Sequence, residues 1–421
     1  MASAGAPSVP EANVPLKMGT RLQLSTMMFL QYLTWGTWFV SLSAYLSANT
    51  GEAGKQIFPE GFVGRAYGTA AIAAMIAPFF VGMIADRFFA TQHVLAVLHI
   101  VGAGILYYLS TVETPGLFYG VMLAYFLCFM PTLALTNSIS FHHLPNPGRQ
   151  FPGIRVLGTI SWICAGQLTG AMGWGTSNTA MQVASGFSLL LGIYCFFLPH
   201  TPPKNVGHAV TARDVLGLDA LALMKRVPFA IFVLGSFLVA IPLQFYYNYT
   251  NGFLTNIGVE NATGKMTYGQ MSEIFFMLLM PVFFARLGVK WMLLVGMLCW
   301  ALRYVLFAFG NSTDGMWMLY IGILLHGICY DFFFVTGQIY VDNEADERIR
   351  GAAQGFIAFI TLGIGGFIGA ELSSYVDRMT VTTGAITHDW KTFWLIPAAL
   401  AAGVMVLFAV AFHDSKSKAG T

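Results

Sequence analysis

Apolar stretches about as long as a membrane is thick recur from one end of this chain to the other. A helix needs about 20 residues to cross the hydrocarbon layer of a bilayer, whereas a strand of a membrane barrel alternates in polarity over about 10. Continuous apolarity over this length therefore predicts helices. The predicted spans are 22–46, 63–85, 93–111, 117–140, 153–173, 179–198, 228–254, 266–286, 289–309, 315–341, 351–376 and 391–412.

The composition supports a membrane protein. Of the 421 residues, 10% are charged and 56% hydrophobic, whereas about 25% of a soluble domain is charged. These residues cannot supply the polar surface that a soluble protein of this length needs. The five cysteines each lie in an apolar stretch and form no CxxC pair, so we interpret them as packing residues.

The longest connection, 199–227, divides the spans six and six. It begins polar and proline-bearing and then predicts a short amphipathic helix from Thr211 to Arg226. We therefore predict an all-α integral membrane protein with twelve transmembrane helices in two six-helix bundles. The predicted parts are a tail at 1–20, an N-terminal bundle at 21–198, the cytoplasmic linker at 199–227, a C-terminal bundle at 228–412 and a tail at 413–421.

Lysine and arginine residues indicate the orientation. Of the 21, 14 fall on the side of both termini, five on the other side, and two, Arg155 and Arg303, within spans. Cytoplasmic loops carry the excess of these residues, so we expect both termini in the cytoplasm. The first 20 residues lack the apolar core of a cleaved signal peptide, and we expect a short disordered tail there.

The two halves of the chain show a weak internal sequence similarity. "APFFVGMIADRF" ends the second span and "MPVFFARLGVKW" ends the eighth, at corresponding positions. Two parallel repeats around a site at the membrane midplane are typical of major facilitator transporters. The turn "GMIADR" partly resembles the signature of that superfamily between its second and third spans.

Ionisable residues within spans are costly and usually face a functional path in the bundle interior. In "FPGIRVLGTISW", Arg155, Thr159 and Trp162 share one helical face. A guanidinium, a hydroxyl and an indole together suit a polar ring compound. The alternative is an arginine that reaches the membrane surface or pairs structurally.

Amide side chains mark the seventh span. In "IPLQFYYNYTNGF", Gln244, Tyr247, Asn248 and Asn251 share one face. Amides both donate and accept hydrogen bonds, as recognition of a nucleobase or a sugar requires. The alternative is that they join neighbouring helices.

The eighth span carries an amide and an acid three residues apart. In "YGQMSEIFFMLLMP", Gln270 and Glu273 point the same way. This carboxylate could accept hydrogen bonds from ribose hydroxyls or carry a proton. Alternatively it is a charge at the helix end, since Lys265 lies nearby.

A single carboxylate interrupts the tenth span, "HGICYDFFFVTGQIYV". Phe334 and Gln338 continue the face of Asp331, and Tyr330 and His326 share an adjacent face. Burial disfavours the charged form of a carboxyl group, which suits an acid that binds and releases a proton.

Asp331 has a structural alternative, a pair with Arg155 or Arg303. We interpret Arg303 and Glu371, the further charges within spans, as structural.

Several long motifs resemble the nucleoside:proton symporter family of the major facilitator superfamily. In chain order they are "LQYLTWGTWF", "FMPTLALTNSISFHHL", "FPGIRVLGTI", "VLGLDALALMK", "MSEIFFMLLMPVFF", "YDFFFVTG" and "RGAAQGF". The likeness covers nearly the whole chain. It implies proton-coupled uptake of nucleosides across a bacterial inner membrane.

The resemblance also implies site residues. The positions that match the family's site are Arg155, Thr159, Gln244, Gln270, Glu273 and Asp331. The sequence departs from the family pattern at Tyr247 (an asparagine expected), Phe334 (a polar residue) and His326 (a phenol). With the residues beside them, the predicted substrate contacts are Arg155, Thr159, Gln244, Tyr247, Asn248, Gln270, Glu273, Tyr330 and Asp331. Glu273 and Asp331 are the predicted proton carriers.

Other classes fit less well. A major facilitator transporter of another small polar solute, such as a sugar or a free nucleobase, is the nearest alternative. A metal-dependent membrane transferase would need paired acidic motifs at a membrane face, where "DNEADERIR" is the one acid-rich segment. A receptor or scaffold would not need charges inside the membrane. With no Walker motif, catalytic triad or metal-ligand cluster in the sequence, we expect no enzyme, cofactor, metal or nucleic-acid partner, and a monomer.

Overall fold

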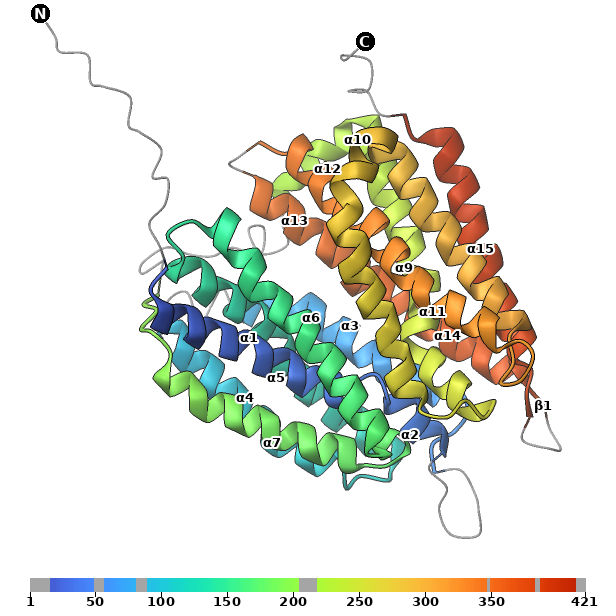
Figure 1. Ribbon diagram of the computed structural model, residues 1–421, viewed down its shortest axis with the longest axis horizontal. Coiled ribbons are helices and arrows are strands. Elements are labelled where there is room, and N and C mark those ends of the chain that lie inside the picture. Colours follow the sequence, from blue (N-terminus) through green and yellow to red (C-terminus); the bar gives the residue numbers. More distant parts are fainter. Residues whose placement is uncertain are drawn as a thin grey trace, which may run out of the picture.

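The computed structural model describes residues 16–48, 57–80, 89–203, 218–346, 349–382 and 387–413. They form two helical bundles arranged as a V (Figure 1). The bundles meet at the end that holds α2 (Leu42–Ala48) and β1 (Val381–Thr382). They separate toward the end where α1 (Met18–Trp38) begins and α15 (Trp390–Ala411) ends.

The N-terminal bundle contains the first six spans. Prolines begin two of its helices, where a missing N–H costs nothing, and the side chain of Asn146 caps one of them by accepting from Arg149 N–H. The remaining elements are α3 (Phe62–Phe80), α4 (Thr91–Leu109), α5 (Pro115–His143), α6 (Pro147–Ala171), α7 (Thr179–Tyr194) and the short turns Trp174–Thr176 and Cys195–Phe197. The first predicted span is divided into α1 and α2.

The C-terminal bundle is less regular. Two of its spans contain a π-helical segment, a form that is rare and frequent at functional sites. Its elements are a 3₁₀ helix (Leu218–Lys225), α9 (Val227–Asn256), α10 (Ala262–Phe309), α11 (Met316–Tyr330), the π segment Asp331–Val335, α12 (Thr336–Glu344), α13 (Arg350–Ala358), the π segment Phe359–Gly365, α14 (Gly366–Thr380), a hairpin of β1 with β2 (Thr387–His388), and α15.

One glycine separates two spans within α10. An unbroken helix of this length would measure about 72 Å, more than twice the hydrocarbon thickness. Gly288 has φ 66° and ψ 177°, outside the helical region. A positive φ suits glycine, which has no Cβ to clash, so the chain breaks here without a loop.

The all-α, twelve-span prediction is confirmed. Within the described ranges, eight continuous helices are long and apolar enough to cross a membrane, and α10 supplies two spans. The other three spans are α1 with α2, α3 and α6. The "GMIADR" turn and the linker start at 204–217 lie outside the described residues. The predicted bounds of the tails and the linker stay predictions.

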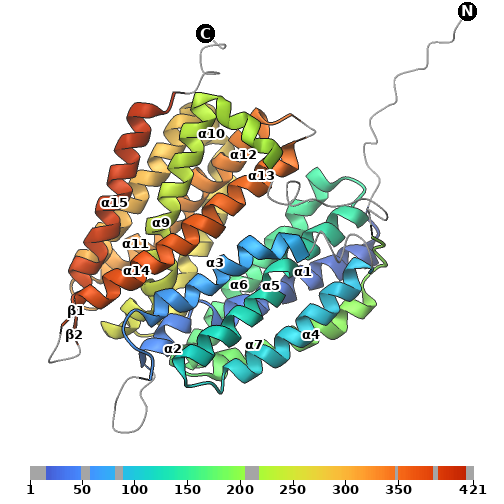
Figure 2. The same cartoon turned by 180° about the vertical axis from the view of Figure 1, so that it is seen from behind.

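The bundles are joined at the closed end of the V by main-chain donors in α3 and just before it. Figure 2 shows α3 beside α14 from behind. Gly61 N–H donates to Asp377 Oδ2 at 2.7 Å, and Gly64 N–H donates to the Tyr249 hydroxyl at 3.1 Å. The Ser374 hydroxyl in turn donates to the carbonyl oxygen of Gly61.

Two further contacts complete this seal. Gly252 N–H of α9 donates to Ser43 Oγ of α2 at 3.0 Å. Gln167 of α6 donates through Nε2 to Thr267 Oγ1 at 2.7 Å and to the carbonyl oxygen of Gly264 at 3.0 Å. The five polar contacts join four pairs of elements: α3 and the preceding Gly61 with α14, α3 with α9, α2 with α9, and α6 with α10. The seal therefore does not depend on a single helix pair.

We predict that Gly64→Ala opens the closed end. A Cβ at this position would lie 2.6 Å from the carbonyl oxygen of Ala370 and 2.9 Å from Ser374 N. Both are backbone atoms that cannot rotate away, so the bundles must separate. The distance between spin labels at Glu60 and Met379, measured by double electron–electron resonance on a background without native cysteines, should increase.

The matched control is Gly120→Ala in α5, where a Cβ meets nothing within 4 Å. Its label distances should equal those of the parent. Identical distance distributions in both variants would show that Gly64 does not hold the seal.

Candidate functional site

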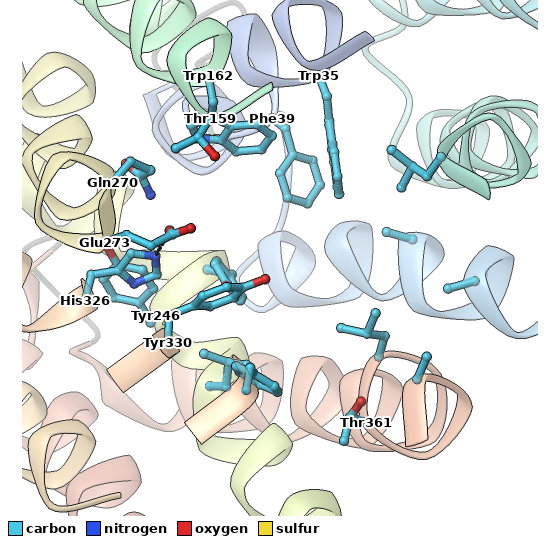
Figure 3. A pocket seen from close by; sticks show the side chains of 18 of the residues that line it. Trp35, Phe39, Thr159, Trp162, Tyr246, Gln270, Glu273, His326, Tyr330 and Thr361 are labelled. Carbon is cyan, nitrogen blue, oxygen red and sulfur yellow. Dashed lines mark ion pairs between the residues drawn. The ribbon is translucent and has the colours of Figure 1, made fainter. Parts of the chain in front are cut away.

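A cavity of about 470 Å³ lies between the two bundles. It extends from the sealed end to Gln338 of α12 and Gln354 of α13, on the open side of the V. Its polar and charged lining includes Arg155, Thr159, Gln244, Gln270, Glu273 and His326. Figure 3 shows Thr159 and Trp162 facing Gln270, Glu273 and His326 across the space.

The N-terminal wall places one arginine on an aromatic ring. Arg155, Thr159 and Trp162 all line the cavity, as their shared face predicts. The guanidinium carbon of Arg155 lies 4.3 Å from the centre of the Tyr32 ring, a cation–π contact. A Cβ at Gly158 would meet both side chains, 2.7 Å from Tyr32 Cδ2 and 2.8 Å from Arg155 Nη1. A residue without a side chain is therefore needed between them.

The C-terminal wall supplies the amides and the acid. Gln244 and Tyr247 of α9 line the cavity together with Gln270 and Glu273 of α10. Glu273 Oε2 lies 3.9 Å from Nε2 of His326, and the side chain of Glu273 is 13% exposed. The dashed line in Figure 3 marks this pair. Within the described part of the chain, no carboxylate lies within ion-pair distance of Arg155.

Two asparagines of α9, Asn248 and Asn251, lie outside the cavity lining. Asn248 donates through Nδ2 to Ser373 Oγ of α14 at 3.3 Å, and Asn251 donates to Thr263 Oγ1 of α10 at 3.0 Å. They share the predicted helical face with Gln244, but α14 and the start of α10 cover that face where the asparagines lie. Their contacts fit the alternative in which amides join helices. Asn248 as a substrate contact stays a prediction that this geometry does not support.

Asp331 also lies behind the cavity wall. It is fully buried, and neither carboxylate oxygen has a hydrogen-bond partner among the described residues. Its neighbours Tyr330 and Phe333 line the cavity instead. Asp331 begins the π-helical segment, whose wider turn shifts the faces that α-helical spacing predicts. A direct contact between Asp331 and substrate stays a prediction.

The structural pair predicted as an alternative for Asp331 is not present in the described residues. All three guanidinium nitrogens of Arg303 lack a hydrogen-bond partner there. The Arg303 side chain is fully buried, and its guanidinium carbon lies 4.1 Å from the centre of the Tyr246 ring. Arg303 thus lies in the core of the C-terminal bundle behind the cavity.

Sequence reasoning missed the aromatic wall of α1. Tyr32, Trp35 and Phe39 all line the cavity, and Trp35 packs edge-on against Trp162 with ring centres 5.3 Å apart. The signal was available, because these residues in "LQYLTWGTWF" lie three and four apart and so share one helical face.

Comparison with known proteins identifies the transporter class. The family model described as Nucleoside H+ symporter matches residues 18–417. The chain belongs to the nucleoside H+ symporter family. It is therefore a multi-pass membrane transporter of the proton-coupled nucleoside class and not an enzyme.

Individual relatives agree over nearly full length. The chain is 42% identical to the "Putative nucleoside transporter YegT" of Escherichia coli K12, covering 95% of this chain and 96% of that protein. It is 34% identical to the "Xanthosine permease" of the same organism, covering 94% and 97%. The crystal structure of the nucleoside transporter NupG matches with a TM-score of 0.84 and 32% identity over 94% of this chain and all of that chain.

A more distant structure shares the fold alone. The D-xylose–proton symporter matches with a TM-score of 0.68 at 14% identity, covering 95% of this chain and 99% of that one. The two-bundle architecture is thus common to transporters whose sequences differ widely.

We predict that Asp331→Asn stabilises the protein. A buried carboxyl group without hydrogen-bond partners costs free energy, and an amide of the same shape removes its charge. The midpoint of thermal unfolding in detergent should rise by roughly 1–2 °C, because about 1 kcal/mol shifts the midpoint less in a long chain than in a short one.

The control is Asp377→Asn, because Asp377 accepts from Gly61 N–H and contacts His388 Nε2 at 2.5 Å. That change should lower the midpoint. Equal shifts of the unfolding midpoint in both variants would contradict the idea that Asp377 is stabilised by its hydrogen bonds and Asp331 is not.

Proposed function

We propose that this protein imports nucleosides together with protons across a bacterial inner membrane, by alternating access around the cavity between its bundles. The observation that carries this is the division of the polar lining, with Arg155 and Thr159 on one bundle and Gln244, Gln270 and Glu273 on the other. A solute bound between them draws both walls together, which is how binding energy can drive a change of access.

The lysine and arginine distribution supports a cytoplasmic location for both termini. The open end of the V then faces the cytoplasm, and the end sealed by Gly61 and Gly64 faces outward. One chain supplies every lining residue named here, which supports a protein that works as a monomer.

Each wall offers a different kind of contact to a nucleoside. Glu273 accepts hydrogen bonds from sugar hydroxyls, and the amides of Gln244 and Gln270 match groups that both donate and accept. The rings of Trp35 and Trp162 provide flat apolar surface on which a base can stack.

Two acids are candidates for the coupling proton. Glu273 lines the cavity, so solute and proton can compete for or share the same carboxylate. Asp331 directly follows the lining residue Tyr330 in the chain and can act on the site through the π-helical segment. Coupled acids titrate as a pair, so the proton is assigned to the pair Glu273 and Asp331.

We predict that proton-driven uptake is abolished when the pH gradient and membrane potential are collapsed. Purified protein in liposomes should accumulate labelled uridine or adenosine under an inward proton gradient, and a protonophore should leave only equilibration. Uptake that persists, or that follows a Na⁺ gradient, contradicts proton coupling. A panel of free bases and sugars in the same assay tests the alternative solutes.

We predict that Arg155→Ala and Glu273→Gln each weaken nucleoside binding about 10-fold to 100-fold, because a hydrogen bond to a charged group contributes roughly 1.5–3 kcal/mol. Calorimetric titration of uridine and adenosine measures the change.

Arg226→Ala is the matched control for Arg155→Ala, because it also removes an arginine. The exposed Arg226 pairs with Glu344 at 3.0 Å, and neither residue lines the cavity, so its loss should leave the Kd unchanged. Wild-type affinity in Arg155→Ala and Glu273→Gln would remove both residues from the site.

A further inference from the structure

We propose that His326 is a positioning residue that orients the Glu273 carboxylate toward the solute. This inference rests on the proposed function, in which Glu273 accepts hydrogen bonds from the bound nucleoside. His326 is the imidazole partner of that carboxylate within the same bundle: its Nε2 lies 3.9 Å from Oε2 of Glu273. A shortened contact between these two atoms would leave the other carboxylate oxygen for the solute.

The geometry places a single imidazole nitrogen at the carboxylate. Nε2 of His326 lies 3.9 Å from Glu273 Oε2, while Nδ1 is buried without a hydrogen-bond partner among the described residues. A buried N–H without an acceptor is costlier than a buried lone pair without a donor. The hydrogen therefore belongs on Nε2, the nitrogen that faces Glu273.

The separation of 3.9 Å is about 1 Å longer than a hydrogen bond between nitrogen and oxygen. Contacts of functional side chains are often long without ligand and shorten in the complex. A small rotation of the Glu273 side chain closes this gap, since its carboxylate lies at the edge of open space in the cavity.

Neighbouring groups favour a neutral imidazole. The His326 ring stacks on Tyr246 with ring centres 5.2 Å apart and an interplanar angle of 20°. The guanidinium of Arg303 packs on the same tyrosine at 4.1 Å. A second positive charge beside this permanent one would be repelled. Tyr247 and Tyr330, the other polar rings around His326, are uncharged phenols.

The backbone fixes the helices that carry the pair. Ser272 Oγ of α10 donates to the carbonyl oxygen of Leu324 at 2.7 Å and accepts from Gly327 N–H at 3.0 Å. A Cβ at Gly269 would lie 3.0 Å from His326 Cβ. Close approach through glycine and serine thus holds α10 and α11 together at this level, so the backbones that carry the two side chains keep their spacing.

Loss of the His326 donor would also affect Arg155 on the opposite wall. Without a donor behind it, the Glu273 carboxylate is free to turn across the cavity toward that guanidinium. A direct pair of the two would occupy the groups that the solute needs. His326 holds Glu273 on its own side, and Tyr32 holds Arg155 on the other.

The test compares variants that keep or remove the donor at position 326. His326→Phe keeps a ring on Tyr246 without a donor, and His326→Met is a second donor-free variant of flexible shape. His326→Gln keeps an amide donor that does not titrate. Each is made with Glu273 and again with Glu273→Gln, and uridine binding is measured by calorimetry across pH after each sample is shown to be monodisperse and folded.

We expect His326→Phe or His326→Met to weaken uridine binding about 10-fold when Glu273 is present. His326→Gln should restore the affinity to within about 3-fold and keep the wild-type pH profile. In the Glu273→Gln background, the donor-free changes should have no further effect, because His326 acts through that carboxylate.

Wild-type affinity in both donor-free variants overturns the inference. So does an equal loss with and without Glu273, which would assign His326 a role independent of the acid. A pH profile altered by His326→Gln overturns the neutral donor. Absence of nucleoside binding by the wild type refutes the proposed function instead, so the two failures are distinguishable.

Discussion

Charge inside a hydrocarbon layer must be offset by polar groups, aromatic faces or water, and this constraint determines where the ionisable side chains of the spans lie. Arg155 lies on the ring of Tyr32 at the cavity, and Arg303 lies on the ring of Tyr246 in the core. Glu273 has an imidazole beside it. None of these three partners carries an opposite formal charge. The two groups that line the cavity, Arg155 and Glu273, therefore remain free to exchange their partners for a solute. A direct ion pair would be harder to separate in a medium of low dielectric constant.

Membrane crossing and helical periodicity made much of the fold predictable from sequence. Length and apolarity located the spans, and the spacing of Arg155, Thr159 and Trp162 placed all three on the cavity wall. Local patterns carry such information because each lies within one helix. Positions that depend on a neighbouring helix could not be predicted in this way: α14 covers Asn248, and no feature of α9 alone reveals that.

In the tenth span, the prediction of helical faces fails for a different reason. Counting from Asp331 by α-helical spacing places it with Phe334 and Gln338, which do line the cavity. The π segment that begins at Asp331 breaks this spacing and turns the acid into the core. Its cause is not a proline or glycine within "DFFFV", so the residues themselves give no warning. A buried acid without partners is costly, and such costs are tolerated where function requires them.

The seal at the closed end is built largely from main-chain N–H groups, those of Gly61, Gly64 and Gly252. Every residue except proline carries this donor. A substitution at Gly64 would therefore leave its hydrogen bond possible and fail for another reason, the volume of the new side chain. Water can replace each acceptor when the bundles part, so no unpaired charge is created at these amides in the other state. At Gly64, the space available in the seal limits the residue more strictly than the polarity of its side chain does.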